Sequence, residues 1–223
     1  MKPWYEIVEP FTTIQSGQIE ETEFTPDLKD IIEGKTSQYY QDPKKFFKIT
    51  YMTRGLLRLF HNVQNKVTLG KGNAVIKLQT PFGGGKTHAL IAIYHFAVNG
   101  KTIARILPEC FTQIDTKLLA IEGTHLNPLE GHKCENLCIQ TLWGEIAYQL
   151  GGNEGYKQFE ENDKKMISPG KEKLNTFLKD FPSFILLLDE IAEYITKADG
   201  IAVNDSNLGT QTLLFLQELT EVL

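Results

Sequence analysis

The stretch Leu78-Gln-Thr-Pro-Phe-Gly-Gly-Gly-Lys-Thr-His88 is the most informative part of this sequence. The segment before it, residues 74–79, predicts a short strand, and the apolar segment after it, residues 88–98, predicts a helix buried against a sheet. Glycines let main-chain N–H groups approach an anion closely, and a helix N-terminus attracts negative charge. A Gly-Lys-Ser/Thr triplet occurs by chance in about one chain in ten of this size, but the two extra glycines and this setting make chance much rarer. We therefore predict a phosphate-binding loop.

The residues of this loop have distinct expected roles. We expect Lys86 to reach the β- and γ-phosphates of a nucleotide, and the Thr87 hydroxyl to bind Mg²⁺. The standard pattern G-x-x-x-x-G-K-[ST] has glycine where this chain has Thr80, so the loop is a variant in its first turn. An ordinary glycine-rich turn with a solvated lysine is the alternative. The predicted nucleotide-binding residues are Thr80, Pro81, Phe82, Gly83, Gly84, Gly85, Lys86, Thr87 and His88.

A second stretch, Phe184-Ile-Leu-Leu-Leu-Asp189-Glu190, complements the loop. A continuous apolar run is typical of a parallel strand covered on both faces, and ligands bind beyond the carboxyl ends of such strands. We expect Asp189 to hold Mg²⁺, and Glu190 to orient and deprotonate an attacking water. The alternative is a strand that happens to end in acids. Consecutive Asp-Glu favours ATP over GTP, since the chain has no Asn-Lys-x-Asp guanine-binding motif.

The order of predicted elements defines an α/β fold. Strands at 74–79, 117–121 and 184–188 alternate with helices predicted at about 138–150, 154–166, 169–180, 190–197 and 209–222. Ser168-Pro169 is the expected cap of the third of these helices. We predict an irregular lead-in over residues 1–41, and then a helix that starts at Asp42-Pro43 and breaks near Thr53. The predicted division is a lead-in of residues 1–72 and a core of residues 73–223.

Composition narrows the functional classes. The 223 residues are 41% hydrophobic and 23% charged, which excludes a disordered tail, and the net charge of −5 gives no bulk signal for nucleic-acid binding. Three cysteines are an odd number without disulfide spacing, which fits a reducing compartment. No apolar run approaches the ~20 residues that span a bilayer. We expect a cytoplasmic protein without a membrane contact.

Other residue groups carry weaker signals. His132, Cys134 and Cys138 offer three zinc ligands without a fourth, and buried thiols are the alternative. Thr124 and His125 follow the second predicted strand, where they could sense a γ-phosphate. A turn or capping role is the alternative for both residues. The candidate adenine-stacking aromatics, which core or interface packing would also explain, are Trp4, Tyr5 and Tyr51.

Three blocks taken together, PFGGGKTHAL, TLWGEIAYQLGG and ILLLDEIAEY, carry a resemblance to a known family. With the opening MKPWYE, the chain resembles the N-terminal ATPase portion of a large AAA+-type P-loop family of bacteria and archaea. That family is classed as a domain of unknown function and is often encoded beside DNA methyltransferases and helicases in phage-defence islands. The resemblance covers essentially the whole chain, and TLWGEIAYQLGG is its most specific part.

This resemblance implies a fold and an activity. The fold is a glutamate-type P-loop sandwich of three layers with a mostly parallel central sheet. Lys86 and Thr87 match the phosphate and Mg²⁺ positions, and Asp189 and Glu190 match the metal and water positions. ATP and Mg²⁺ are the implied cofactors, and ATP-driven remodelling of a DNA-associated complex is the implied activity. The implied partners are DNA-modification or helicase proteins; direct DNA contact and a homo-oligomer stay open.

Members of that family are several times longer than this chain. We therefore expect a truncated ATPase core that lacks a sensor strand and an arginine finger. The resemblance implies that the sensor strand lies in the sheet between the strands predicted at 74–79 and 184–188. The alternative function is a non-hydrolysing nucleotide-binding scaffold or assembly module. Phosphotransfer to a small molecule is a third class, but no arginine-rich lid is present in the sequence.

Overall fold

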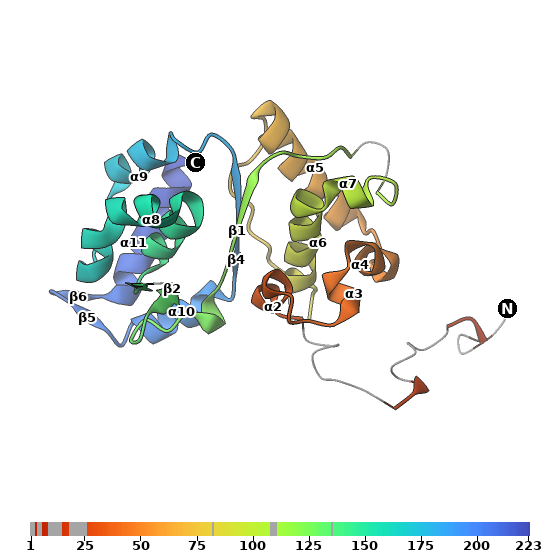
Figure 1. Ribbon diagram of the computed structural model, residues 1–223, viewed down its shortest axis with the longest axis horizontal. Coiled ribbons are helices and arrows are strands. Elements are labelled where there is room, and N and C mark those ends of the chain that lie inside the picture. Colours follow the sequence, from red (N-terminus) through yellow and green to blue (C-terminus); the bar gives the residue numbers. More distant parts are fainter. Residues whose placement is uncertain are drawn as a thin grey trace.

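The computed structural model describes residues 3, 6–8, 15–17, 26–81, 83–107, 111–134 and 136–223. It is a mixed α/β structure in which a small parallel sheet lies between two groups of helices (Figure 1). The helices are α2 (Leu28–Glu33), α3 (Gln38–Gln41), α4 (Pro43–Ile49), α5 (Arg54–Leu69), α6 (Lys86–Val98), α7 (Gly100–Ile103), the 3₁₀ turn η3 (Gly123–His125), α8 (Leu142–Lys165), α9 (Lys171–Leu178), α10 (Ile191–Ala198) and α11 (Leu208–Val222). The strands are β1 (Lys117–Glu122), β2 (His132–Cys134), β3 (Leu137–Ile139), β4 (Phe184–Asp189), β5 (Ala202–Val203) and β6 (Ser206–Asn207). None of the described helices is both long enough and apolar enough to cross a bilayer.

The parallel sheet consists of β1 and β4. Their register runs from Lys117 opposite Phe184 to Glu122 opposite Asp189, so both strands end at the same edge. The side-chain amide of Gln149 on α8 covers the free side of β1, donating to the Ala120 carbonyl oxygen at 3.3 Å and accepting from its N–H at 3.2 Å. A side chain in this position satisfies backbone groups that another strand would otherwise use.

Both faces of β4 are covered, as its continuous apolar run predicts. Alternate residues of a strand point to opposite faces. Ile185 and Leu187 belong to a core built with α2, α4, α5, α6 and α7. Leu186 and Leu188 pack against a second core built with α8, α9, α10 and α11. Figure 1 shows these helical layers on either side of β1 and β4.

The N-terminal part holds more helix than the sequence predicts. The described end of the expected irregular lead-in, residues 26–41, contains α2 and α3. Asp42 does cap α4 as expected, accepting from the Lys44 N–H at 2.8 Å. The predicted break is also confirmed, because the Thr53 hydroxyl oxygen accepts from the Leu56 N–H at 3.1 Å and begins α5.

The predicted strand at residues 74–79 is wrong. This segment has no ladder partner among the described residues, and Val75 and Ile76 are 47% and 37% exposed. Strand propensity alone does not make a strand, since the backbone groups need a neighbouring strand to pair with. In the described part of the chain, β4 has β1 as its one strand partner. No strand between residues 74–79 and β4 is found among the described residues, and the expectation that the chain lacks a sensor strand stays a prediction.

The middle of the chain differs from the prediction in its boundaries. Residues 138 and 139, expected at the start of a helix, belong instead to β3, which pairs with β2. The division into two helices, predicted at 138–150 and 154–166, is confirmed, because α8 consists of two helical segments that meet at a kink at Gly152, with φ 61° and ψ −149°. Such dihedrals are nearly restricted to glycine, which explains why the Gly-Gly pair marks the bend.

Two other boundaries also change. The expected cap at Ser168 is wrong, since α9 begins after Gly170 and the Ser168 hydroxyl donates to Glu218 Oε2 at 2.6 Å. The short hairpin β5–β6, which the sequence does not predict, leads into α11. Its strands have two residues each, too few to produce a detectable period.

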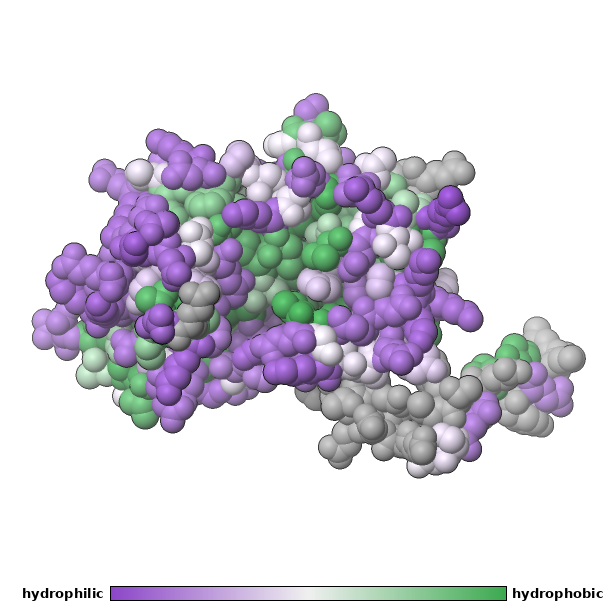
Figure 2. All heavy atoms as spheres, in the orientation of Figure 1, coloured by the Kyte–Doolittle hydropathy of each residue, from purple (hydrophilic) through white to green (hydrophobic). Residues whose placement is uncertain are grey.

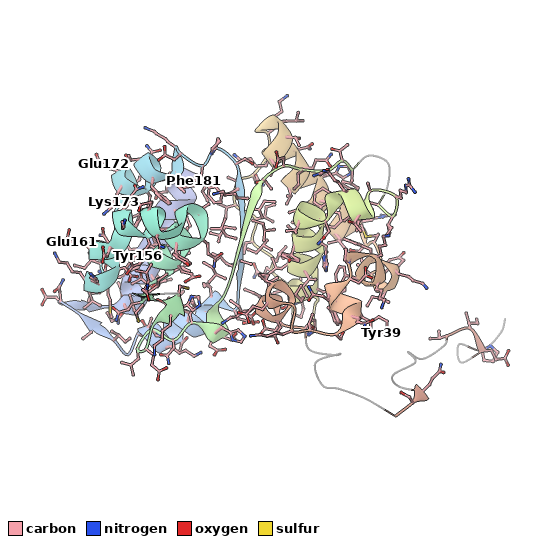
Figure 3. The ribbon with its side chains drawn as sticks, in the orientation of Figure 1. Tyr39, Tyr156, Glu161, Glu172, Lys173 and Phe181 are labelled. Atoms are coloured by element: carbon pink, nitrogen blue, oxygen red, sulfur yellow. The ribbon has the colours of Figure 1, made fainter. Side chains whose placement is uncertain are left out.

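The block TLWGEIAYQLGG, residues 141–152, packs against the buried carboxylate of Asp163. Asp163, fully buried, accepts from the Thr141 N–H at 2.9 Å and from the Tyr156 hydroxyl at 2.9 Å. A Cβ on Gly144 would lie 2.3 Å from Asp163 Oδ1, so this carboxylate needs a glycine beside it. Figure 3 shows Tyr156 within this helical layer, with Tyr39 across the sheet. Asp163, in the second half of α8, thus holds the start of the first half through its bond to Thr141.

Candidate functional site

The glycine-rich loop is a tight turn before α6. Gly83 and Gly85 have φ of 73° and 75°, the left-handed region that glycine adopts without strain. Gly84 has a different requirement, because a Cβ there would lie 2.5 Å from the Thr80 side chain. The Gly84 N–H donates to the Pro81 carbonyl oxygen at 3.0 Å. Thr80, which stands where the standard pattern has glycine, is thus an exposed residue whose side chain lies against Gly84; the predicted site residue Phe82 lies outside the described residues.

Thr87 and Asp189 meet although they are 102 residues apart. The Thr87 hydroxyl, in the first turn of α6, donates to Asp189 Oδ2 at 2.7 Å. Asp189, at the end of β4, is 6% exposed, and its Oδ1 accepts from the Glu190 N–H at 3.0 Å. Hydroxyl and carboxylate oxygens are the donors that Mg²⁺ prefers, so this pair has the right chemistry to share one ion.

Lys86 is the first residue of α6 and is half-buried. Within the part of the chain that the structure describes, no acid forms an ion pair with its ammonium. Its sequence neighbour Thr87 contacts Asp189, so a cation at the start of α6 and an acid at the end of β4 lie on the same side of the molecule. A phosphate chain held there would meet both a positive group and a carboxylate-bound metal.

Glu190 follows Asp189 and is exposed. Its φ of 45° and ψ of 32° place a non-glycine residue in the left-handed region just before α10. Its carbonyl oxygen accepts from the Glu193 N–H at 3.0 Å, which begins that helix. Glu190 is therefore fixed by its main chain at the sheet edge that also carries Asp189, and the residue is exposed there.

His88 directs its ring away from the loop. Thr50 gives its one hydroxyl proton to the Phe46 carbonyl oxygen at 2.7 Å, so at 3.0 Å the His88 Nε2–H must be the donor to the Thr50 oxygen. The ring also lies 4.7 Å from that of Phe46. Burial lowers the pKa of His88. The ring contacts these N-terminal helices, and only the main chain of His88 belongs to the loop.

The end of β1 carries a second group of titratable side chains. Burial, together with the neighbouring Asp27 carboxylate, raises the pKa of Glu122 from its ordinary 4.5 to about 7. Glu122 Oε2 accepts from the Leu28 N–H at 3.1 Å, and Oε1 accepts from the Thr124 hydroxyl at 3.0 Å. His125 pairs with Asp27. Thr124 and His125 thus both contact carboxylates in this structure, and a role for them in sensing a γ-phosphate stays a prediction.

The zinc candidates divide between the two faces of the β2–β3 hairpin. His132 Nδ1 lies 2.8 Å from Glu145 Oε2, and Cys134 Sγ lies 3.4 Å from the same nitrogen. Donor atoms of these three residues lie within 4.8 Å of one another. Cys138 is exposed and donates to the Glu130 carbonyl oxygen at 3.3 Å, so the expectation of a buried thiol in a helix is wrong. The sequence did not indicate Glu145, because its approach to His132 depends on the hairpin.

The aromatic candidates receive little support. Tyr51 is 85% exposed, so the alternative of a core aromatic is wrong for it. Trp4, Tyr5 and the third cysteine, Cys110, lie outside the described residues. In the orientation of Figure 1, Figure 2 shows polar residues over most of the surface. Apolar surface gathers in the middle of this view, between the sheet and α6.

Fold and site define a mixed α/β protein with a small parallel sheet, a glycine-rich loop and acids at one sheet edge. A family model, the DUF499 N-terminal domain, matches residues 14–223. The chain belongs to this family, whose function is uncharacterised. The comparisons with curated proteins and with solved structures found no match.

Proposed function

We propose that this chain binds Mg²⁺-ATP between the loop and the acid strand and hydrolyses it, as a P-loop ATPase of the AAA+, glutamate-type class. The observation that supports the proposal most strongly is the hydrogen bond between Thr87 and Asp189. Two motifs far apart in the sequence meet through the two side chains that Mg²⁺ coordination requires. A chance glycine-rich turn would have no reason to contact the acid strand.

Each residue has a role in this proposal. The Lys86 ammonium and the main chain from Thr80 to His88, Phe82 included, hold the phosphates, and Thr87 and Asp189 hold the ion. Bound Mg²⁺ would neutralise charge on the β- and γ-phosphates. Glu190 orients a water in line with the γ-phosphate and accepts its proton as the new P–O bond forms and the bond to ADP breaks. The phosphate-bound amides and Lys86 stabilise the charge that develops in the transition state.

A non-hydrolysing nucleotide-binding module is the second candidate. It is favoured by the Gly84 N–H, which is occupied by Pro81 rather than directed outward, and by the exposure of Glu190. A loop that must rearrange to accept phosphate, and a base open to solvent, suit assembly as well as turnover.

Steady-state hydrolysis of Mg²⁺-ATP by the wild type and by Glu190→Gln separates the two candidates. Removal of a general base costs about 10²–10⁴-fold in rate, so we expect a loss of that size with the affinity for ATP retained. Glu193→Gln, a substitution at an exposed glutamate of α10, is the matched control and should hydrolyse at the wild-type rate. Equal rates for the wild type and Glu190→Gln would contradict hydrolysis by this residue and support the non-hydrolysing module.

For the whole protein, we propose ATP-driven remodelling of a DNA-linked complex in phage defence. The support is the resemblance of the sequence blocks, and the net charge of −5 argues against DNA binding through bulk charge. ATP-dependent co-purification of a DNA methyltransferase or helicase with the wild type, but not with Lys86→Ala, is the expected result. Recovery of the same partners with both proteins would contradict a role for the nucleotide in this assembly.

A further inference from the structure

The end of β1 touches the main chain of Glu190 through Gly123. Gly123 is buried in η3, directly after the strand residue Glu122. A Cβ built on Gly123 would lie 2.2 Å from the Glu190 carbonyl oxygen and 2.9 Å from the Ile191 Cα. Both are main-chain atoms, which cannot rotate away as a flexible side chain can. Only a glycine fits this position without displacing Glu190, which is a known use of glycine where two backbones approach closely.

The backbone of Glu190 is held from several sides. A non-glycine residue in the left-handed region is strained and persists only where its surroundings impose the conformation. Here the N–H donates to Asp189 Oδ1 at 3.0 Å, the carbonyl accepts from Glu193 at 3.0 Å, and Gly123 lies against that same carbonyl. The position of this residue is thus imposed by its neighbours, which is the arrangement expected where a side chain must be aimed.

A side-chain contact reinforces the approach. Lys197 Nζ, on α10, donates to the Thr124 carbonyl oxygen at 3.0 Å. Thr124 follows Gly123, so this bond ties η3 to the helix that begins after Glu190. The same ammonium pairs with Glu193 Oε1 at 2.7 Å on the surface of α10.

We infer that Gly123 is a positioning residue for hydrolysis: its bare Cα lets η3 seat the Glu190 main chain, and Lys197 keeps η3 in place. The inference rests on the proposed ATPase function. Gly123 touches no nucleotide in this scheme and acts through Glu190. Because a displacement of about 1 Å in a catalytic group can cost about 100-fold in rate, a single methyl group at position 123 should impair the reaction and leave nucleotide binding intact.

The test compares kcat and the affinity for Mg²⁺-ATP in Gly123→Ala and the wild type. We expect kcat to fall about 100-fold with an unchanged Kd, and no further fall when Gly123→Ala is added to Glu190→Gln. Gly55→Ala is the matched control, since its Cβ would have its nearest neighbour at 3.8 Å, and its kcat should equal that of the wild type. A general loss of structure would lower affinity and melting temperature as well as kcat.

A second variant covers the case in which Gly123→Ala does not fold. Lys197→Met changes an exposed side chain and removes both its hydrogen bond to Thr124 and its ion pair with Glu193. The control Glu193→Gln removes the ion pair alone and leaves the bond from Lys197 to Thr124 in place. We expect a fall in kcat for Lys197→Met alone. Wild-type kcat in a folded Gly123→Ala, or in Lys197→Met where the first variant is unfolded, would overturn the inference while leaving ATP hydrolysis intact. A wild type that does not hydrolyse ATP, whether or not it binds it, would overturn the proposed hydrolysis, and the inference with it.

Discussion

The acid strand and the segment leading into the loop differ in how they are supported. β4 is paired with β1 and buried on both faces, so the position of Asp189 is fixed by packing as well as by hydrogen bonds. Residues 74–79 are exposed apart from the half-buried Leu78, and they have no strand partner in the described part of the chain. The loop that follows holds its shape through glycine dihedrals and a single turn. One half of the candidate site is therefore built by the core, and the other by local backbone chemistry.

The largest expected effect comes from a substitution that creates a cavity beside the acid strand β4. Leu187 is 5% exposed in the core that faces α6. Replacement of a buried leucine by alanine typically costs about 2–5 kcal/mol. We expect Leu187→Ala to lower the free energy of unfolding by an amount in this range, measured by urea denaturation. A loss below about 1 kcal/mol would contradict the claim that packing fixes this strand.

The loop should lose ligand affinity rather than stability. Lys86→Ala removes a charged hydrogen-bond donor to phosphate, which contributes about 1.5–3 kcal/mol, or roughly 10–150-fold in affinity. We expect at least this loss in a titration with Mg²⁺-ATP, with the free energy of unfolding unchanged. Lys101→Ala, on the exposed surface of α7, is the control and should bind as the wild type does. Unchanged affinity in Lys86→Ala would refute the assigned loop.

The neighbouring end of β1 should make stability depend on pH. The raised pKa of Glu122, about 7, means that folding favours its protonated form. This contribution is complete below the ordinary value of 4.5 and is lost as the pH rises through about 7. Glu122→Gln cannot ionise, so the fall in unfolding free energy between pH 5 and pH 8 should shrink. Urea denaturation at both values, with the exposed Glu154→Gln as control, measures it; an unchanged fall would contradict the assignment.

The smallest effect is expected in the exposed segment. Ile76 is 37% exposed and makes no strand pair among the described residues. Surface substitutions usually change stability by less than about 0.5 kcal/mol, so Ile76→Ala should unfold at nearly the wild-type urea midpoint. A loss comparable to that of Leu187→Ala would show that residues 74–79 are packed like β4 and would remove the contrast.

The features predicted from the sequence are those that local chemistry or periodicity determines. The cap at Asp42, the break near Thr53, the buried helix after the loop and the strands around 117–121 and 184–188 follow from capping residues and apolar patterns. The approach of Thr87 to Asp189 also follows in outline, because ligand sites in α/β sheets gather at the carboxyl ends of strands.

What the sequence did not predict depends on distant neighbours. Residues 74–79 have strand propensity, but no partner strand. The hairpin β2–β3 has strands of three residues, too short for alternation to appear, and it brings His132 to Glu145. Gly123 has no special signal in the sequence, because its requirement for glycine comes from its tertiary contact with the Glu190 main chain.

The most direct test of the central claim is the effect of Mg²⁺ on ATP affinity in the wild type and in Asp189→Asn. If Thr87 and Asp189 share the ion, the wild type should bind ATP more tightly with Mg²⁺ than with a chelator, and Asp189→Asn should lose most of that difference. Calorimetric titration of both proteins under both conditions gives the four affinities. An equal gain from Mg²⁺ in the two proteins would contradict the account.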